Sequence, residues 1–252
     1  MKQQTFQQIG RFIPAFAFAS WLFPNSIYTI ENLSPKVQQA IEIIRQQKNF
    51  PFCAKIVQKL NGPKGFEKRK GLYCAKAGKF KAKFYVPHET IVFNGKKIYW
   101  KIKGNPFTWT LSAEAMHFPS PNHALPKEIL VIKELKPNFW EKLFHPNLQK
   151  VSIMTAKNPT RKLVVTLDLT LPAIVQRVLL NQYGQVLIRE KYANPIRIHN
   201  KIFFRTVQIE MAGKIPILNE TVYSEITAYP KLSKDYFQPP AGPYKEFHAS
   251  NQ

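Results

Sequence analysis

The chain has 252 residues, of which 44% are hydrophobic and 13% aromatic, enough for a sizeable core in one domain. Its 37 basic and 15 acidic side chains give a formal net charge of +22, which favours contact with phospholipid head groups, acidic proteins or nucleic acid. A basic source proteome would give the same excess. Beyond the N-terminal segment no apolar run is long enough for a transmembrane helix, so we expect a soluble mature protein.

The N-terminus is typical of an export signal. Lys2 and Arg11 supply positive charge, residues 12–23 form an apolar run, and small or turn-forming residues follow. The run is too short to span a bilayer as a helix, and it lacks a clean Ala-x-Ala cleavage site. We predict a signal peptide over residues 1–26, with an uncleaved leader or a buried helix as the alternative.

A helix is predicted after Ser34-Pro35, because serine is a good N-cap and proline suits the first helical position. Apolar residues at positions i, i+3, i+4 and i+7 form one stripe: Val37, Ala40, Ile41 and Ile44. Pro51 ends the helix. Such a stripe is typical of a helix that covers a hydrophobic core.

Cys53 and Cys74 lie equidistant from the centre of a turn over residues 61–65, which is rich in glycine and proline. Opposed residues of an antiparallel hairpin lie close enough for a disulfide, and an exported protein would oxidise them. A three-residue loop would shift the register, and cysteine also serves as a small buried apolar residue. Both states of the pair therefore stay open.

Residues 79–86 alternate between basic and apolar side chains, which predicts a half-buried strand. The apolar members share one face: Phe80, Ala82 and Phe84. Asn94-Gly95 predicts a tight turn between a strand that begins at Thr90 and another over 97–103.

Prolines break residues 104–146 into short pieces. We predict strands over 107–111 and 129–132 and a short amphipathic helix over 138–144. The apolar side chains of this helix are Phe139, Trp140, Leu143 and Phe144. Aromatic residues at this spacing either pack in a core or form a movable cover.

The second half predicts a meander of apolar, β-branched strands. Their ranges are 151–156, 162–169, 174–180, 185–191, 197–210 and 221–228. Turn signals separate them, among them Asn194-Pro195 and Ala212-Gly213. Long antiparallel strands in series favour a curved sheet that nearly closes on itself. Residues 243–252 are predicted to be a loose tail.

No motif of a known enzyme site occurs in the sequence: neither a P-loop, nor His-Glu-x-x-His, nor Gly-x-Ser-x-Gly, nor Cys-x-x-Cys. The six histidines are scattered, and His117 and His123 have no carboxylate at ligand spacing. Asp168 stands alone on a strand, which favours a structural role. We predict no catalytic residue, no metal and no cofactor, and hence no enzyme.

Residues 72–100 resemble the periplasmic lipoprotein carriers of the LolA family and their lipoprotein-sorting relatives. The matching positions are Leu72, Gly78, Phe80, Pro87, Ile91, Gly95, Ile98 and Tyr99-Trp100. The chain departs from the family pattern where Lys76 replaces arginine, Ala77 proline, Ala82 tryptophan and Asn94 aspartate.

The resemblance implies an α+β fold that is mainly antiparallel β: a strongly curved, incomplete β-barrel whose helices cover the concave mouth. One such domain would span residues 27–242. The predicted lipid cavity is lined by Val37, Ile41, Ile44, Phe80, Phe84, Ile91, Ile98, Trp100, Phe139, Trp140 and Phe144. Whether Ile91 or Val92 faces inward stays open. In the family an arginine holds a lid closed, and Lys76 would do so here without the planar fork of donors.

The resemblance also implies a non-enzymatic, monomeric carrier that shields the acyl chains of lipoproteins, or a related lipid, between inner and outer membrane. An inner-membrane ABC transporter would be the donor and an outer-membrane protein the acceptor. A lipid-sensing module of the kind that regulates anti-sigma factors is the alternative. Basic residues interleaved with aromatic ones would also fit single-stranded nucleic acid, but the export signal argues against such a partner.

Overall fold

The computed structural model describes residues 29–31, 33–46, 50–62, 65–112, 129–155, 158–213 and 216–246. In these ranges fifteen strands form one sheet, accompanied by two helices. The predicted signal peptide, residues 1–26, lies outside the described residues. Neither of the two helices combines the length and the apolar character needed to cross a membrane.

The elements fall into three runs along the chain. The first contains β1 (Thr29–Glu31), α2 (Pro35–Gln46), β2 (Phe52–Gly62), β3 (Gly65–Lys76), β4 (Lys79–Val86), β5 (His88–Phe93), β6 (Lys97–Ile102) and β7 (Thr108–Ser112). The second contains β8 (Ile129–Leu135), α3 (Phe139–Phe144), β9 (Leu148–Thr155), β10 (Asn158–Asp168), β11 (Ala173–Leu180), β12 (Val186–Ile198), β13 (Lys201–Met211) and β14 (Ile217–Ala228). The last is β15 (Tyr244–Glu246).

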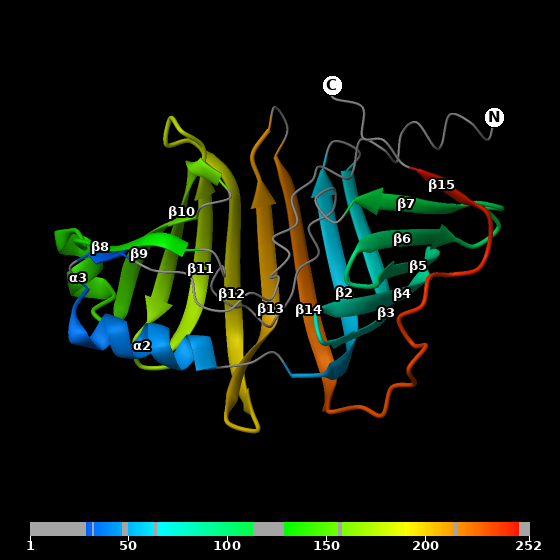
Figure 1. Ribbon diagram of the computed structural model, residues 1–252, viewed down its shortest axis with the longest axis horizontal. Helices are drawn as coiled ribbons and strands as arrows, with labels where there is room; N and C mark the ends of the chain where they lie inside the picture. The colour runs from blue at the N-terminus through cyan, green and yellow to red at the C-terminus, as the bar shows by residue number, and fades with distance from the viewer. Residues whose placement is uncertain are drawn as a thin grey trace.

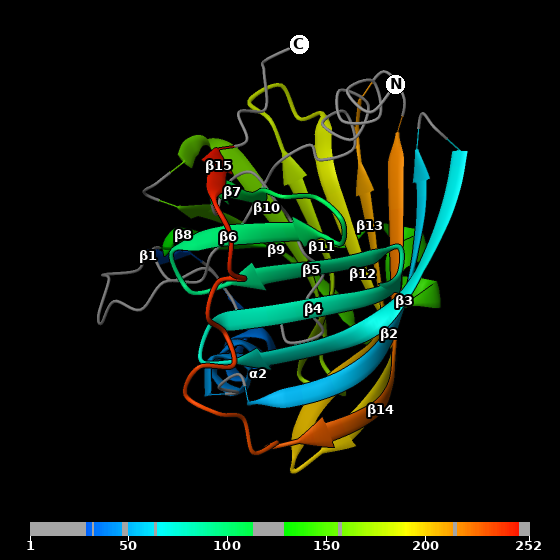
Figure 2. The ribbon, with the colours of Figure 1, turned by 90° about the vertical axis from the view of Figure 1, so that its right-hand side faces the viewer.

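The sheet is antiparallel except at its two edges. Its order is β1-β8-β9-β10-β11-β12-β13-β14-β2-β3-β4-β5-β6-β7-β15, and the short edge strands β1 and β15 pair in parallel with β8 and β7. Since these edges do not pair with each other, the sheet stays open. Figures 1 and 2 show it bent into a trough, with β12–β14 and β2 at the back and β3–β7 as one side wall. The predicted incomplete barrel is confirmed.

Helix α2 lies on the open side of the trough, in front of β10–β12 (Figure 1). All four residues of its predicted apolar stripe are buried, and burial of Val37, Ile41 and Ile44 contributes roughly 5–9 kcal/mol. The backbone N–H of Ser34 donates to the Glu134 carboxylate at 2.6 Å, and its hydroxyl donates to the same group. These bonds fix the beginning of the helix to β8.

Two predictions about the second half of the chain are wrong. β12 runs through Asn194-Pro195, and the chain turns only at His199-Asn200, where both residues have positive φ. The predicted loose tail is ordered over Tyr244–Glu246, which form β15 beside β7. The segment that leads to it also contacts the sheet, because the Lys81 ammonium donates to the carbonyl of Tyr236 at 3.3 Å.

Gly71 is required where β3 and β4 approach each other at a register shift. A Cβ at this position would lie 2.2 Å from the carbonyl oxygen of Lys83. We expect Gly71→Ala to lower the free energy of unfolding by about 2 kcal/mol or more, because backbone atoms must move apart. Chemical denaturation measures the loss.

Gly65→Ala is the matched control for Gly71→Ala. No atom lies within 4 Å of its Cβ position, but the φ of Gly65 is +93°, so the cost is about 1 kcal/mol of backbone strain. An equal or smaller loss for Gly71→Ala would contradict the close approach.

Candidate functional site

The inward-facing side chains of β2–β7 line up in ranks across the strands, as the register dictates. One rank contains Phe52, Ala75, Phe80, Phe93, Ile98 and Leu111. The neighbouring rank contains Ala54, Tyr73, Ala82, Ile91, Trp100 and Trp109. Both ranks are apolar and belong to the core or pack against it. They form a continuous hydrophobic inner wall.

Five of the predicted cavity residues lie together in this wall. Phe84, Ile91, Ile98 and Trp100 are buried, and Phe80 packs against the core. The register decides between the two candidates in β5, because Ile91 pairs with Ala82 and Trp100 while Val92 faces the opposite side. Val37, Ile41 and Ile44 of α2 belong to the same hydrophobic core.

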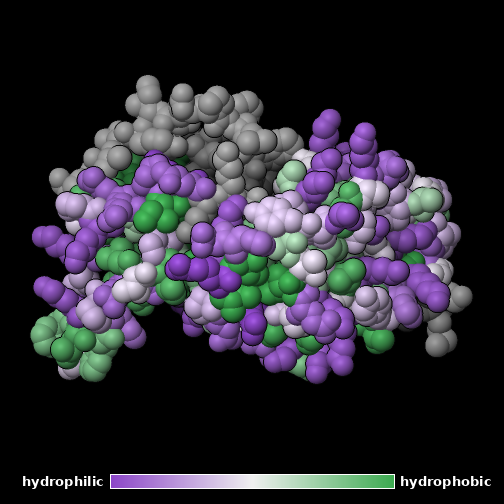
Figure 3. Space-filling view, turned by 90° about the horizontal axis from the view of Figure 1, so that it is seen from below, coloured by the Kyte–Doolittle hydropathy of each residue, from purple (hydrophilic) through white to green (hydrophobic). Residues whose placement is uncertain are grey.

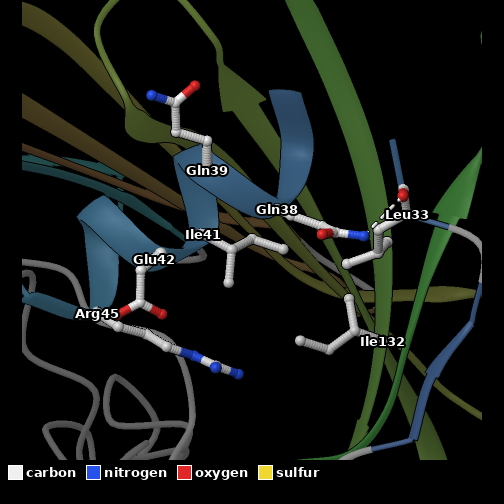
Figure 4. A pocket seen from close by; sticks show the side chains of 7 residues that line it. All are labelled: Leu33, Gln38, Gln39, Ile41, Glu42, Arg45 and Ile132. Carbon is white, nitrogen blue, oxygen red and sulfur yellow. Dashed lines mark hydrogen bonds between the residues drawn. The ribbon is translucent and has the colours of Figure 1, made fainter. Parts of the chain in front are cut away.

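A pocket of about 330 Å³ lies between α2 and β8, at the small end of the range of ligand pockets. Figure 4 shows Leu33, Ile41 and Ile132 pointing toward one another across it. Polar side chains of α2 form the remaining lining: Gln38, Gln39, Glu42 and Arg45. The arrangement is an apolar floor with a polar rim, which suits an apolar ligand with a polar end.

Helix α3 does not cover the mouth of the sheet. None of its residues is buried, and Figure 2 shows this green helix at the right, on the side opposite α2. The structure therefore separates Phe139, Trp140 and Phe144 from the other cavity candidates, and the prediction that they line the cavity is wrong. Helix α3 connects β8 to β9, which lie near one edge of the sheet.

The predicted latch residue, Lys76, lies on β3. It ends β3 at the two-residue turn before β4 and is exposed there. Ala77 and Gly78 in this turn both have positive φ. Within the described part of the chain no carboxylate forms an ion pair with Lys76, so nothing supports a latch.

Cys53 and Cys74 form a disulfide, with their Cα atoms 4.1 Å apart. They are directly paired across β2 and β3 because Gly62 pairs with Gly65, which leaves a loop of two residues. Of the two states that the sequence left open, the structure has the bonded one. The hydroxyl of Tyr236 lies 3.2 Å from the Cys74 sulfur, so the bond also contacts the C-terminal segment.

A buried carboxylate interrupts the inner wall at Glu89. The Arg69 guanidinium contacts it at 2.5 Å, and the Trp100 indole N–H donates to its other oxygen at 2.7 Å. Burial raises the pKa of the Glu89 carboxyl above its ordinary value of 4.5, although Arg69 and Trp100 partly offset this effect. Arg69 also lies over the Phe84 ring.

A second buried carboxylate, Glu190, lies on β12. It accepts a hydrogen bond from the Tyr192 hydroxyl and lies 3.7 Å from the Arg177 guanidinium. Burial raises the pKa of the Tyr192 hydroxyl well above its usual range. The pairing across the strands brings Glu190 beside Ile209 and Arg177, so the group faces the same interior as the apolar ranks.

A row of paired residues, polar except for Val207, runs between the two carboxylates across the inner face. The pairs are Tyr192↔Val207, Val207↔Thr221, Thr221↔Gln58 and Gln58↔Arg69. Gln58, Thr221 and Asn219 are buried and hydrogen-bonded to one another. The interior therefore has an apolar part and a largely polar row. In this row Arg69 pairs with Glu89, and Arg177 pairs with Glu190.

Sequence reasoning missed both carboxylates, although a signal was present. Glu89 is two residues before Ile91, and Glu190 is two residues after Ile188, so strand alternation places both on the inward face. An acidic residue at an inward position of an alternating strand predicts a buried carboxylate with a cationic partner.

Comparison with solved structures shows which fold this is. A domain named as an outer membrane lipoprotein-sorting protein, from Vibrio parahaemolyticus, is 13% identical with a TM-score of 0.61, and covers 81% of this chain and 94% of its own. The LolA superfamily protein NE2245 from Nitrosomonas europaea is 12% identical with a TM-score of 0.56, over 80% and 96% of the two chains. A DUF1329 family protein from Desulfovibrio piger is 10% identical with a TM-score of 0.58, over 81% and 95%.

The chain has a LolA-like fold. No protein-family model and no curated protein sequence matches it. At these identities the likeness extends to the path of the chain and not to individual side chains. The LolA-like trough is what brings Phe84, Ile91 and Trp100 on one wall into the same core as the stripe of α2.

The raised pKa of Glu89 predicts a defined dependence of stability on pH. Because the folded protein holds the Glu89 proton more tightly than the unfolded chain, the stabilisation is full below about pH 4.5 and is lost as pH rises through the folded pKa. We expect the free energy of unfolding of the wild type, relative to Glu89→Gln, to fall across this window and then to level off. Urea unfolding at a series of pH values measures it.

Glu220→Gln is the matched control, because Lys59 and Gln208 donate to the Glu220 carboxylate and lower its pKa. Stabilisation from Glu220 is therefore present above its unfolded pKa and lost as pH falls through its folded pKa. If both glutamates gave the same direction, the assignment of burial as the dominant effect at Glu89 would be wrong.

Proposed function

We propose that this protein is a periplasmic carrier that shields the acyl chains of lipoproteins, or of a related lipid, on their way from the inner to the outer membrane. The observation that carries the proposal is the apolar interior of the trough, with the pocket floor formed by Leu33, Ile41 and Ile132. The LolA-like fold supports it, since two of the solved structures are named for lipoprotein sorting and for LolA.

Burial of an acyl chain requires no catalyst. A methylene group gains about 0.8 kcal/mol on leaving water, so a chain of about sixteen carbons gains on the order of 10 kcal/mol. The interior offers apolar side chains for such contacts, and the buried carboxylates Glu89 and Glu190 are each held by an arginine. We therefore propose binding and release of lipid without a chemical reaction.

The pocket of about 330 Å³ would hold only part of such a chain. Helix α2 is the element that would admit the remainder, because it is attached to the sheet by its apolar stripe and by the bonds between Ser34 and Glu134. An acyl chain that replaced the contacts of this stripe would compensate for their loss. Loading would then displace α2 outward from β10–β12.

The disulfide between Cys53 and Cys74 supports an oxidising compartment such as the periplasm. The proposed partners are an inner-membrane lipoprotein-releasing ABC transporter as donor and an outer-membrane protein as acceptor. In this scheme the carrier works as a monomer, because the cargo must leave one membrane and reach the other on a single soluble molecule.

The proposal predicts that protein purified from the periplasm of an export-competent host carries acyl lipid. We expect near-stoichiometric lipid in the wild type and at least about tenfold less in Leu33→Trp and Ile41→Trp, because an indole fills the pocket. Mass spectrometry of the extracted protein measures bound lipid.

Lys36→Trp is the matched control, because Lys36 is exposed on the same helix and does not line the pocket. It should retain wild-type lipid. Lipid-free wild type would contradict the proposal, and so would equal lipid content in the folded filling variants. Transfer of bound lipid to acceptor vesicles separates a carrier from a sensor, which would retain its ligand.

A further inference from the structure

Helix α3 presents four large apolar side chains to solvent. Phe139, Trp140, Leu143 and Phe144 are 72%, 63%, 57% and 65% exposed. We call this group the α3 knob. Figure 3 shows a hydrophobic cluster projecting at the left end of the molecule, where Figure 1 places α3. Contiguous exposed apolar surface of this kind marks an interaction site.

The knob is held in a fixed shape although it contributes nothing to the core. Asn138 accepts from the backbone N–H of Glu141, and the Glu141 side chain accepts from the backbone N–H of Asn138, which completes a capping box. Lys150 of β9 forms an ion pair with Glu141. The Trp140 and Phe144 rings stack at 5.8 Å, so the aromatic side chains support one another.

Basic side chains lie on the helix of the knob and on the segments that flank it in the chain. Lys133, Lys136 and Lys142 are exposed on or near it, and residues 133–150 contain four lysines against two glutamates. One of those glutamates, Glu141, is paired with Lys150, and the other, Glu134, binds Ser34. The knob therefore combines aromatic side chains with an excess of positive charge, in a protein of net charge +22.

We propose that the α3 knob docks the protein onto the surface of an anionic phospholipid bilayer. Its four apolar side chains are all exposed on one short helix, and apolar side chains of this kind enter the interface of a membrane to a depth of about 5–10 Å. Tryptophan is typical of the membrane–water interface, and each nearby lysine is attracted to anionic lipid. Insertion buries the aromatic rings while the lysines stay among the head groups.

A bilayer fits the knob better than a protein partner does. The knob is convex and the residues around it carry a net positive charge, whereas the apolar centre of a protein interface is depleted of charged residues. This docking surface is separate from the pocket of the proposed carrier function, because α3 lies on the side opposite α2 (Figure 2). The proposal goes beyond acyl-chain binding and stands without it.

Binding to vesicles tests the proposal directly. The probe is large vesicles of equal parts phosphatidylglycerol and phosphatidylcholine, with pure phosphatidylcholine vesicles for comparison. We expect the wild type to co-sediment with the anionic vesicles, and the triple variant Phe139→Ser, Trp140→Ser, Phe144→Ser to partition roughly tenfold or more weakly. Lys136→Ala with Lys142→Ala should weaken binding to the anionic vesicles alone.

The matched control is Phe66→Ser with Tyr183→Ser, which removes two exposed aromatic side chains at other places on the molecule. It should bind vesicles as the wild type does. All of these variants should melt within about 2 °C of the wild type, because the side chains that they change are exposed. The tryptophan emission of the wild type should also shift to shorter wavelength on binding, and the emission of the triple variant, which lacks Trp140, should not.

Three outcomes would overturn the proposal. The first is wild-type partitioning of the folded triple variant, and the second is equal weakening by the control variant. The third is a dimer in solution that the triple variant abolishes, since the knob would then bind a second copy of the chain. Loss of lipid from the pocket variants leaves vesicle binding by the knob intact, so the two proposals fail separately.

Discussion

Burial of one face of a single large sheet is the constraint on which this structure depends. Fifteen strands in one open sheet present far more apolar surface than a flat arrangement could cover. The sheet bends so that its inner face turns toward itself, and α2 contributes a stripe of aliphatic side chains to the same core. The bonds between Ser34 and Glu134 fix where that helix begins.

Charged side chains also differ between the inner and the outer face of the sheet. The lysines of β4 alternate with inward apolar residues, and the two inward carboxylates, Glu89 and Glu190, are each compensated by an arginine and by an aromatic donor. Most lysines in the described part of the chain are exposed. A protein of this kind presents positive charge to anionic surfaces while it keeps an interior suited to hydrocarbon.

Local patterns predicted the parts of the fold that depend on neighbouring residues. Alternation placed Phe80, Ala82 and Phe84 on one face, helical spacing identified the stripe of α2, and equal distances from a turn paired Cys53 with Cys74. These features follow from the periodicity of strands, helices and hairpins. The resemblance over residues 72–100 led to the correct fold because these residues belong to β3–β6, which form most of the side wall of the trough.

Features that depend on distant parts of the chain could not be predicted in the same way. The path of β12 through Asn194-Pro195 is supported by pairing with β13, which overrides a local turn signal. β15 is ordered because β7 offers it a free edge. The amphipathic pattern of α3 does not show whether its apolar side chains meet a core or solvent, and only the fold places them outside.

Photo-crosslinking with a fatty acid that carries a diazirine in its acyl chain tests most directly the claim that the interior of the trough holds hydrocarbon. Peptide mapping should find the label on α2 and β8, at residues such as Leu33, Ile41 and Ile132. Labelling confined to α3 or to the outer face of the sheet would contradict it.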